Sequence, residues 1–192
     1  MTSDNIRDGV PARQPFGLGI LLGRFQPVHL GHCAMIDVGL RVCARVGVLI
    51  GSSEESMTEK NPFTYEERRD MLKAVYGDRI TVAPIPDIGV GNTFAWGSYV
   101  IDTCIKTFGE APEIFVTGTE ERRSSWFIPS LGIYELCVPK ALPVSASSVR
   151  KMLSEGSFEK WKRVTPPELH GSYEVQKKRI ESVAGNSGTQ SL

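Results

Sequence analysis

The sequence predicts an α/β fold with a mostly parallel sheet covered by helices on both faces. Short apolar runs bounded by glycine or proline alternate with longer segments whose apolar residues recur at helical spacing. This alternation is typical of βαβ units with right-handed crossovers. The 192 residues, 41% of them hydrophobic and 23% charged, suffice for one packed core. We therefore expect a Rossmann-like, doubly wound sheet with a C-terminal helical extension.

Five short apolar segments are predicted as strands. They read GLGILLG (17–23), VGVLIG (46–51), RITVAPI (79–85), EIFVTG (113–118) and IYELCVP (133–139). In open parallel sheets, ligands bind beyond the carboxyl ends of the strands, where the strand order reverses. We expect the residues that directly follow the first strand to lie at that place.

Helices are predicted between and after these strands. Residues 29–46 have apolar residues at helical spacing, and further helices are expected around 95–109, from about 147, and over roughly 157–182. The helix in NPFTYEERRDMLKAVYG should begin after the N-cap Thr64, with Glu67 completing a capping box, and end at Gly77. We expect a flexible arm at 1–15, one domain at 16–182 and a disordered tail at 183–192.

Bulk charge and cysteine usage limit the classes of function. Lys+Arg and Asp+Glu both number 22, which argues against a nucleic-acid or membrane-surface partner. No apolar run approaches the ~18 residues of a membrane span, and the polar opening MTSDNIRDGVPARQ lacks the apolar core of a signal peptide. The four scattered cysteines form no C-x-x-C pair. We expect a cytoplasmic protein with buried free thiols and no protein-held metal.

The stretch GRFQPVHLGH, residues 23–32, combines the features of a phosphate site. His29 and His32 are separated by about one helical turn, ~4.5 Å of rise, so both imidazoles can face one ligand. Gly31 removes a side chain where a nucleotide must come close, and the helix N-terminus offers free N–H groups. Arg24 adds a permanent cation. The alternative is a strand–turn–helix whose histidines are merely hydrogen-bonded.

A second stretch, VSASSVR (144–150), repeats this chemistry after the fifth strand. Arg150 would lie on the first turns of a helix, where its guanidinium could bind a phosphate. Ser145 and Ser147 can cap that helix or donate to a phosphate, and the sequence leaves both alternatives open.

Together these stretches resemble the H-x-G-H nucleotidyltransferase superfamily, in the form of the archaeal-type nicotinamide-nucleotide adenylyltransferases. Further matching motifs follow in the family's order: EKNPFTYEER (59–68), PIPD (84–87), WGSYV (96–100), VTGTE (116–120) and VSASSVRKML (144–153). The resemblance implies transfer of AMP from ATP to nicotinamide mononucleotide (NMN), with NAD and pyrophosphate as products. It covers residues 17–170.

The resemblance also assigns residues to the two substrates. It implies catalytic roles for His29, His32 and Arg150, and ATP or phosphate contacts for Gly23, Arg24, Phe25, Gly31, Gly118, Ser145 and Ser147. NMN would contact Asp87, Asn92 and Trp96, with the indole on the nicotinamide ring; a lone Trp is otherwise a core residue. The loop at 52–60 overhangs the site, where Lys60 could neutralise phosphate and three acidic residues oppose it.

The implied chemistry needs no general base, because a phosphate with a second pKa near ~6 is mostly a dianion at neutral pH. Mg²⁺ is expected to arrive on ATP, and the protein is expected to be a homo-oligomer. One alternative is a transferase of the same fold that acts on phosphopantetheine or with a cytidyl donor, although the RTEGIST signature is absent. The other is a nucleotide-binding sensor without turnover.

Overall fold

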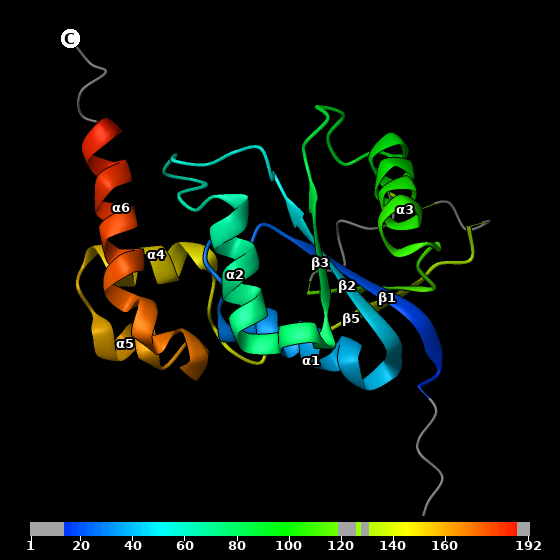
Figure 1. The fold of residues 1–192 in the computed structure, drawn as a ribbon, viewed down its shortest axis with the longest axis horizontal. Coiled ribbons are helices and arrows are strands. Elements are labelled where there is room, and N and C mark those ends of the chain that lie inside the picture. Colours follow the sequence, from blue (N-terminus) through cyan, green and yellow to red (C-terminus); the bar gives the residue numbers. More distant parts are fainter. Residues whose placement is uncertain (1–13, 119–125, 128–130, 188–192) are drawn as a thin grey trace, which may run out of the picture.

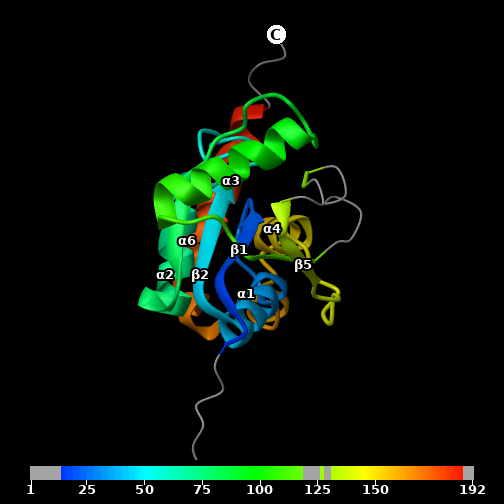
Figure 2. The same ribbon diagram turned by 90° about the vertical axis from the view of Figure 1, so that its right-hand side faces the viewer.

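The computed structural model describes residues 14–118, 126–127 and 131–187. Its centre is a five-stranded sheet in the order β3-β2-β1-β4-β5, in which every neighbouring pair is parallel. The strands are β1 (Phe16–Gly23), β2 (Cys43–Gly51), β3 (Thr81–Ile85), β4 (Ile114–Thr117) and β5 (Tyr134–Cys137). Figure 2 shows β2, β1 and β5 in this spatial order across the molecule. The predicted fold class is confirmed, and the strand order reverses between β1 and β4.

Helices cover both faces of the sheet (Figure 1). α1 (Leu30–Val42) and α2 (Tyr65–Tyr76) pack on one face and α3 (Phe94–Phe108) on the other; a short 3-10 helix, η1 (Gly77–Arg79), follows α2. Because β1 and β2 are buried on both sides, their residues alternate between two cores. Leu21 and Val48 face α1 and α2, whereas Ile20 and Leu49 face α3.

The first predicted helix is too long at its C-terminal end. Residues 43–46 belong to β2, and α1 ends at Val42. Cys43 pairs with Phe16 and Arg45 with Leu18 in the parallel ladder with β1. The apolar spacing at 42–46 fits either structure, and the ladder decides because it satisfies backbone groups that would otherwise be buried without partners.

The start of α2 is as predicted. Thr64 is the N-cap, its hydroxyl accepts from the Glu67 N–H, and the Glu67 carboxylate accepts from the Thr64 N–H. The helix ends at Tyr76, and Gly77 takes a φ of 55°, which glycine adopts without strain.

The C-terminal helices form a third small core beside the sheet (Figure 1). They are α4 (Ala146–Ser154), α5 (Phe158–Lys162), the 3-10 helix η4 (Pro167–Ser172) and α6 (Tyr173–Ser187). Its buried residues are Val144, Val149, Leu153, Trp161 and Tyr173. Residues 183–187, expected in the tail, continue α6, and Val183 is buried. Residues 1–13 of the expected arm and 188–192 of the expected tail lie outside the described residues.

Among the described residues, none of the helices is both long and apolar enough to cross a membrane. The four cysteines all lie in the described ranges and form no disulfide; Cys33, Cys43 and Cys104 are buried, and Cys137 is half-buried.

Candidate active site

Two adjoining cavities open at the carboxyl end of the sheet. The first cavity, of about 360 Å³, lies where the strand order reverses, between the ends of β1 and β4 and the start of α4. The second cavity, of about 480 Å³, lies between the ends of β1 and β2 and the loop before α3. Leu22, Gly23 and Arg24 line both. The site therefore has two compartments with a common wall.

The structure sorts the predicted residues by compartment. All residues predicted for catalysis or ATP binding line the first cavity: Gly23, Arg24, Phe25, His29, Gly31, His32, Gly118, Ser145, Ser147 and Arg150. All residues predicted for NMN line the second cavity: Asp87, Asn92 and Trp96. Lys60 is exposed and lines neither cavity. Their binding roles stay predictions, but their grouping in space agrees with them.

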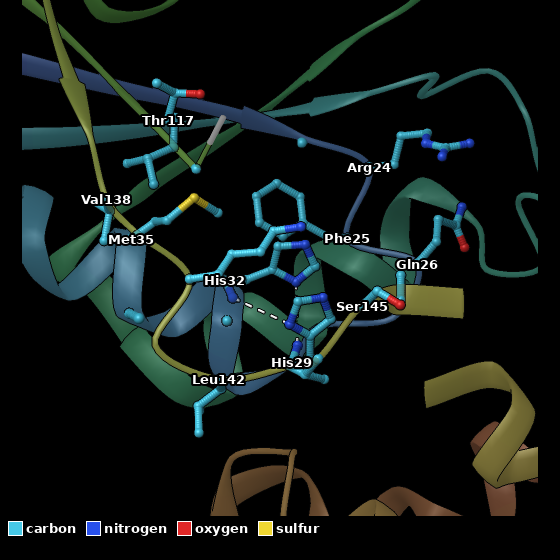
Figure 3. A pocket seen from close by; sticks show the side chains of 18 of the residues that line it. Arg24, Phe25, Gln26, His29, His32, Met35, Thr117, Val138, Leu142 and Ser145 are labelled. Atoms are coloured by element: carbon cyan, nitrogen blue, oxygen red, sulfur yellow. Dashed lines mark hydrogen bonds between the residues drawn. The ribbon is translucent and has the colours of Figure 1, made fainter. Parts of the chain in front are cut away.

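His29 and His32 form a reciprocal cap at the start of α1. The His32 N–H donates to Nδ1 of His29, and the His29 N–H donates to Nδ1 of His32, both at 3.3 Å (Figure 3). The two rings stack with centroids 3.7 Å apart and planes 20° from parallel. Because each Nδ1 accepts a hydrogen bond, the proton of each neutral imidazole is on Nε2.

Burial keeps both histidines uncharged. It lowers the pKa of His29 to about 4, with a further contribution from the positive charge of Lys140. Burial also lowers the pKa of His32 well below 6.5, and the neighbouring His29 adds to this shift. At neutral pH the pair therefore offers two Nε2–H donors without net charge.

The residues around the histidines fix the positions of their rings. A Cβ at Gly31 would lie 3.0 Å from the His29 ring, so this glycine makes room for a catalytic candidate as well as for a nucleotide. Phe25 has a φ of 53°, which is rare for a residue with a side chain, and its ring lies 4.7 Å from that of His32 between centroids. A Cβ at Gly23 would approach the same Phe25 ring to 3.2 Å.

The first cavity has a polar end and an apolar wall. Figure 3 shows Arg24 and Gln26 on one side of the histidines and Met35, Val138 and Leu142 on the other. This arrangement suits a ligand with an apolar base at one end and anionic groups at the other.

Arg150 supplies a half-buried cation at the polar end. Its Nη1 donates to the Gln26 carbonyl at 2.8 Å, and its Nη2 donates to the Ser147 hydroxyl at 3.3 Å. Burial lowers the pKa of Arg150, and the nearby positive charge of Arg24 adds to this shift. Two arginines that repel each other are poised to share an anion.

The serines of VSASSVR have intramolecular partners. Ser145 is the N-cap of α4, where its hydroxyl accepts from the Ser148 N–H at 3.1 Å. The Ser147 hydroxyl accepts from Arg150. Capping is thus present at Ser145, and Ser147 orients Arg150. Both residues still line the first cavity.

In the second cavity, the candidate side chains are tied to one another and to the core. The Asp87 carboxylate accepts from the Ser52 hydroxyl at 2.7 Å, and the Asp87 N–H donates to Glu54 Oε1 at 3.0 Å. The Asn92 side-chain oxygen accepts from the Trp126 indole N–H at 3.2 Å. Trp96 is only 7% exposed, so most of the indole is core and a small part faces the cavity.

Among the described residues, a cluster of carboxylates lies beside the second cavity, whose wall contains Asp87. Among the described residues, Glu54, Glu55 and Asp87 form the one group of three possible metal ligands, with ligand atoms within 4.8 Å of one another. All three side chains are exposed, and exposed acidic groups often occur without an ion. None of the described residues that line the first cavity is Asp or Glu.

Sequence reasoning missed several residues of these walls. Gln26, Thr117 and Lys140 line the first cavity, and Ser52 and Trp126 line the second. Lys140 follows the fifth strand, and its position at a strand's carboxyl end was an available signal. Gln26 and Trp126 gave no local signal, because their partners Phe63 and Asn92 are more than thirty positions away.

The chain matches a known family over half of its length. The family model described as Cytidylyltransferase-like matches residues 20–123, which include the H-x-G-H motif at 29–32 and the strands around it. Nicotinamide-nucleotide adenylyltransferase of Thermococcus onnurineus is 32% identical over 156 residues, with 77% of each chain covered. The chain therefore belongs to the cytidylyltransferase-like family of nucleotidyltransferases, in the branch of the nicotinamide-nucleotide adenylyltransferases.

Other relatives match over shorter parts of their length. Nicotinamide-nucleotide adenylyltransferase of Saccharolobus solfataricus is 42% identical over 88 residues, which are 43% of this chain and 50% of the relative. A bifunctional NMN adenylyltransferase/ADP ribose pyrophosphatase from Francisella tularensis, solved with AMP and a manganese ion, has a similar fold. Its TM-score is 0.71 at 20% identity, with 90% of this chain and 53% of that chain covered.

Proposed function

We propose that this protein transfers AMP from ATP to NMN and releases NAD and pyrophosphate. The observation that carries the proposal is the pair of adjoining cavities with Gly23 and Arg24 in their common wall. The first cavity offers cations and neutral N–H donors beside an apolar wall, as ATP requires. The second offers an aromatic edge and polar side chains, as NMN requires. The family membership agrees with this assignment.

The reaction is an in-line displacement at the α-phosphorus of ATP. A phosphate oxygen of NMN forms the new P–O bond, and the bond between the α-phosphorus and the oxygen that bridges to the β-phosphate breaks. The electron pair leaves with pyrophosphate. Because the nucleophile is already ionised, positioning and charge stabilisation provide the catalysis.

Each site residue then has a definite part. The Nε2–H groups of His29 and His32 donate to phosphate oxygens, with His32 nearest the oxygens whose charge grows during attack. Arg150 holds the leaving pyrophosphate. Arg24, in the common wall, neutralises the NMN phosphate and ATP together.

Mg²⁺ fits this site as a companion of ATP. The first cavity shows no carboxylate among its described lining residues, so phosphate oxygens and water would supply most of its ligands. The metal would neutralise phosphate charge when bound. The protein's own donors orient the α-phosphate.

A pyrophosphate-release assay tests the proposal. ATP is offered with NMN, nicotinic acid mononucleotide, phosphopantetheine or no acceptor, and CTP replaces ATP in a parallel series. Turnover with ATP and NMN is expected, with NAD as product. Turnover only with phosphopantetheine or CTP would contradict the substrates, and saturable ATP binding without turnover on any acceptor would indicate a sensor.

A further inference from the structure

Arg68 on α2 is a fully buried cation, 0% exposed, without an ion pair among the described residues. Its guanidinium donates only to backbone carbonyls. Nε donates to Thr64 at 3.0 Å, and Nη1 donates to Arg24 at 3.1 Å and to Gly51 at 2.9 Å. Nη2 donates to Ser52 at 3.1 Å and, at 3.5 Å, to Glu55.

Such a residue is costly to retain for stability alone. Taking a charge out of water without a direct ion pair is expensive, and burial lowers the pKa of Arg68, while the negative charges of Glu54 and Glu66 partly oppose this shift. The five N–H donors of a planar guanidinium are the feature that an apolar residue or a lysine cannot reproduce. We therefore explain the presence of a buried arginine at position 68 by the backbone carbonyls to which its N–H groups donate.

These hydrogen bonds join the walls of the two cavities. Arg24 is the residue of the common wall, and Gly51 and Ser52 end β2 at the second cavity. Ser52 in turn donates to Asp87. One side chain thus bonds both to the backbone of Arg24 in the common wall and to the backbone at the edge of the second cavity.

A second link from the same segment runs to the first cavity. The side-chain amide of Gln26, 1% exposed, both donates to and accepts from the backbone of Phe63, each at 2.9 Å. The backbone carbonyl of Gln26 accepts from Arg150 Nη1 at 2.8 Å. The NPFTYEER segment (61–68) therefore bonds to Arg24 and Gln26, which precede the two histidines, in addition to starting α2.

We propose that Arg68 is a positioning residue for adenylyl transfer, which acts by fixing Arg24 between the two substrates. This inference rests on the proposed function. In-line attack requires two phosphates at a set distance, and a displacement of about 1 Å can cost 10²-fold in rate. Arg68 touches no substrate in this account and affects turnover only through Arg24.

The test is a double-mutant cycle in kcat. Arg68→Lys keeps the charge but loses the fork, and we expect kcat to fall about 10- to 100-fold while the Kd for ATP stays within several-fold. In an Arg24→Ala background the same change should cost less than about three-fold, because the positioned group is gone. Arg69→Lys, one residue along the same helix, is the matched control and should leave kcat unchanged.

Turnover is counted per molecule that binds ATP, so that loss of folded protein is not counted as loss of catalysis. Arg68→Gln, which keeps two donors without charge, is measured in the same way. Additive losses in the cycle, normal kcat in Arg68→Lys, or failure of both variants to fold would each overturn the proposal in favour of a structural role. Absence of NAD formation by the wild-type protein would instead refute the proposed function.

Discussion

The two cavities share a wall but differ in charge. The first is lined by Arg24, Lys140 and Arg150 and by no described carboxylate. The second has Asp87 in its wall, with Glu54 bonded to the Asp87 backbone. This division suits an anionic polyphosphate in the first cavity and, in the second, the nicotinamide ring of NMN, which is a positively charged pyridinium. Of the charged residues described in the two linings, only Arg24 belongs to both.

The two cavities also differ in their histidines, which line the first cavity and are uncharged. The first cavity already holds several cations, and two charged imidazoliums would raise their mutual repulsion. Burial keeps His29 and His32 neutral, so that the cavity gains donors without further charge. In the second cavity no histidine is among the described lining residues; the Ser52 hydroxyl donates to the Asp87 carboxylate, and the Asn92 amide oxygen accepts from the Trp126 indole.

The largest effect is expected for His32→Ala in the first cavity. Loss of one donor to a developing charge typically costs about 10²- to 10³-fold in kcat, or about 3–4 kcal/mol. The Kd for ATP should stay within several-fold of wild type. Measurement of kcat, Kd and Tm on one preparation separates catalysis from folding. A variant that melts lower but turns over normally per folded molecule would make His32 a structural residue.

A second effect of the first cavity concerns stability against acid. His29 has a pKa of about 4 in the folded protein and an ordinary value of 6.5, so the unfolded chain binds the proton more tightly between these values. The free energy of unfolding should therefore fall as pH decreases through this window. The loss attributable to His29 is about 3 to 4 kcal/mol at most, from the difference between 6.5 and about 4 at about 1.36 kcal/mol per pKa unit.

Urea unfolding at several pH values, for wild type and His29→Asn, measures this loss. Asparagine keeps an N-cap acceptor, so the variant should lose less stability than wild type between pH 6.5 and 4. Parallel curves for the two proteins would show that the protonation of His29 does not limit acid stability.

In the second cavity we expect a smaller, substrate-specific effect at Trp96. An aromatic contact contributes about 0.5–1.5 kcal/mol beyond burial, so Trp96→Leu should raise the KM for NMN about 3- to 10-fold and leave that for ATP unchanged. Trp161→Leu, a fully buried Trp in the C-terminal core, is the matched control for lost packing. If both variants lower Tm alike and neither changes the KM for NMN, Trp96 is a core residue only.

How much the sequence could predict follows from the range of each interaction. The capping box of Thr64 and Glu67 is a local pattern and is found as expected. The spacing of His29 and His32 is also local, and the two residues cap each other at the start of α1. The end of α1 was misplaced because the β1–β2 ladder, not the local spacing, decides residues 43–46. Local patterns thus locate the site but not the limits of its elements.

The supporting contacts escaped prediction for the same reason. The NPFTYEER segment reads as a capped helix, and nothing near Arg68 shows that its donors meet carbonyls up to 44 positions away. For Gly31, the sequence predicted only room for a nucleotide. It could not show that the His29 ring, positioned by the reciprocal cap, also needs this space.

The smallest effect concerns the charge of the second cavity itself. If its acidic rim favours the neutral carboxamide of NMN over the carboxylate of nicotinic acid mononucleotide, removing one charge should weaken the preference. Glu54→Gln keeps an oxygen for the Asp87 N–H and removes only the charge. Because two exposed charges interact by about 1 kcal/mol or less, we expect the ratio of kcat/KM for the two mononucleotides to fall about 2- to 5-fold. Glu181→Gln on α6 should leave this ratio unchanged, and added salt should reduce the wild-type preference in the same direction. A ratio that is insensitive to both Glu54→Gln and salt would show that shape and hydrogen bonding, not charge, distinguish the second cavity from the first.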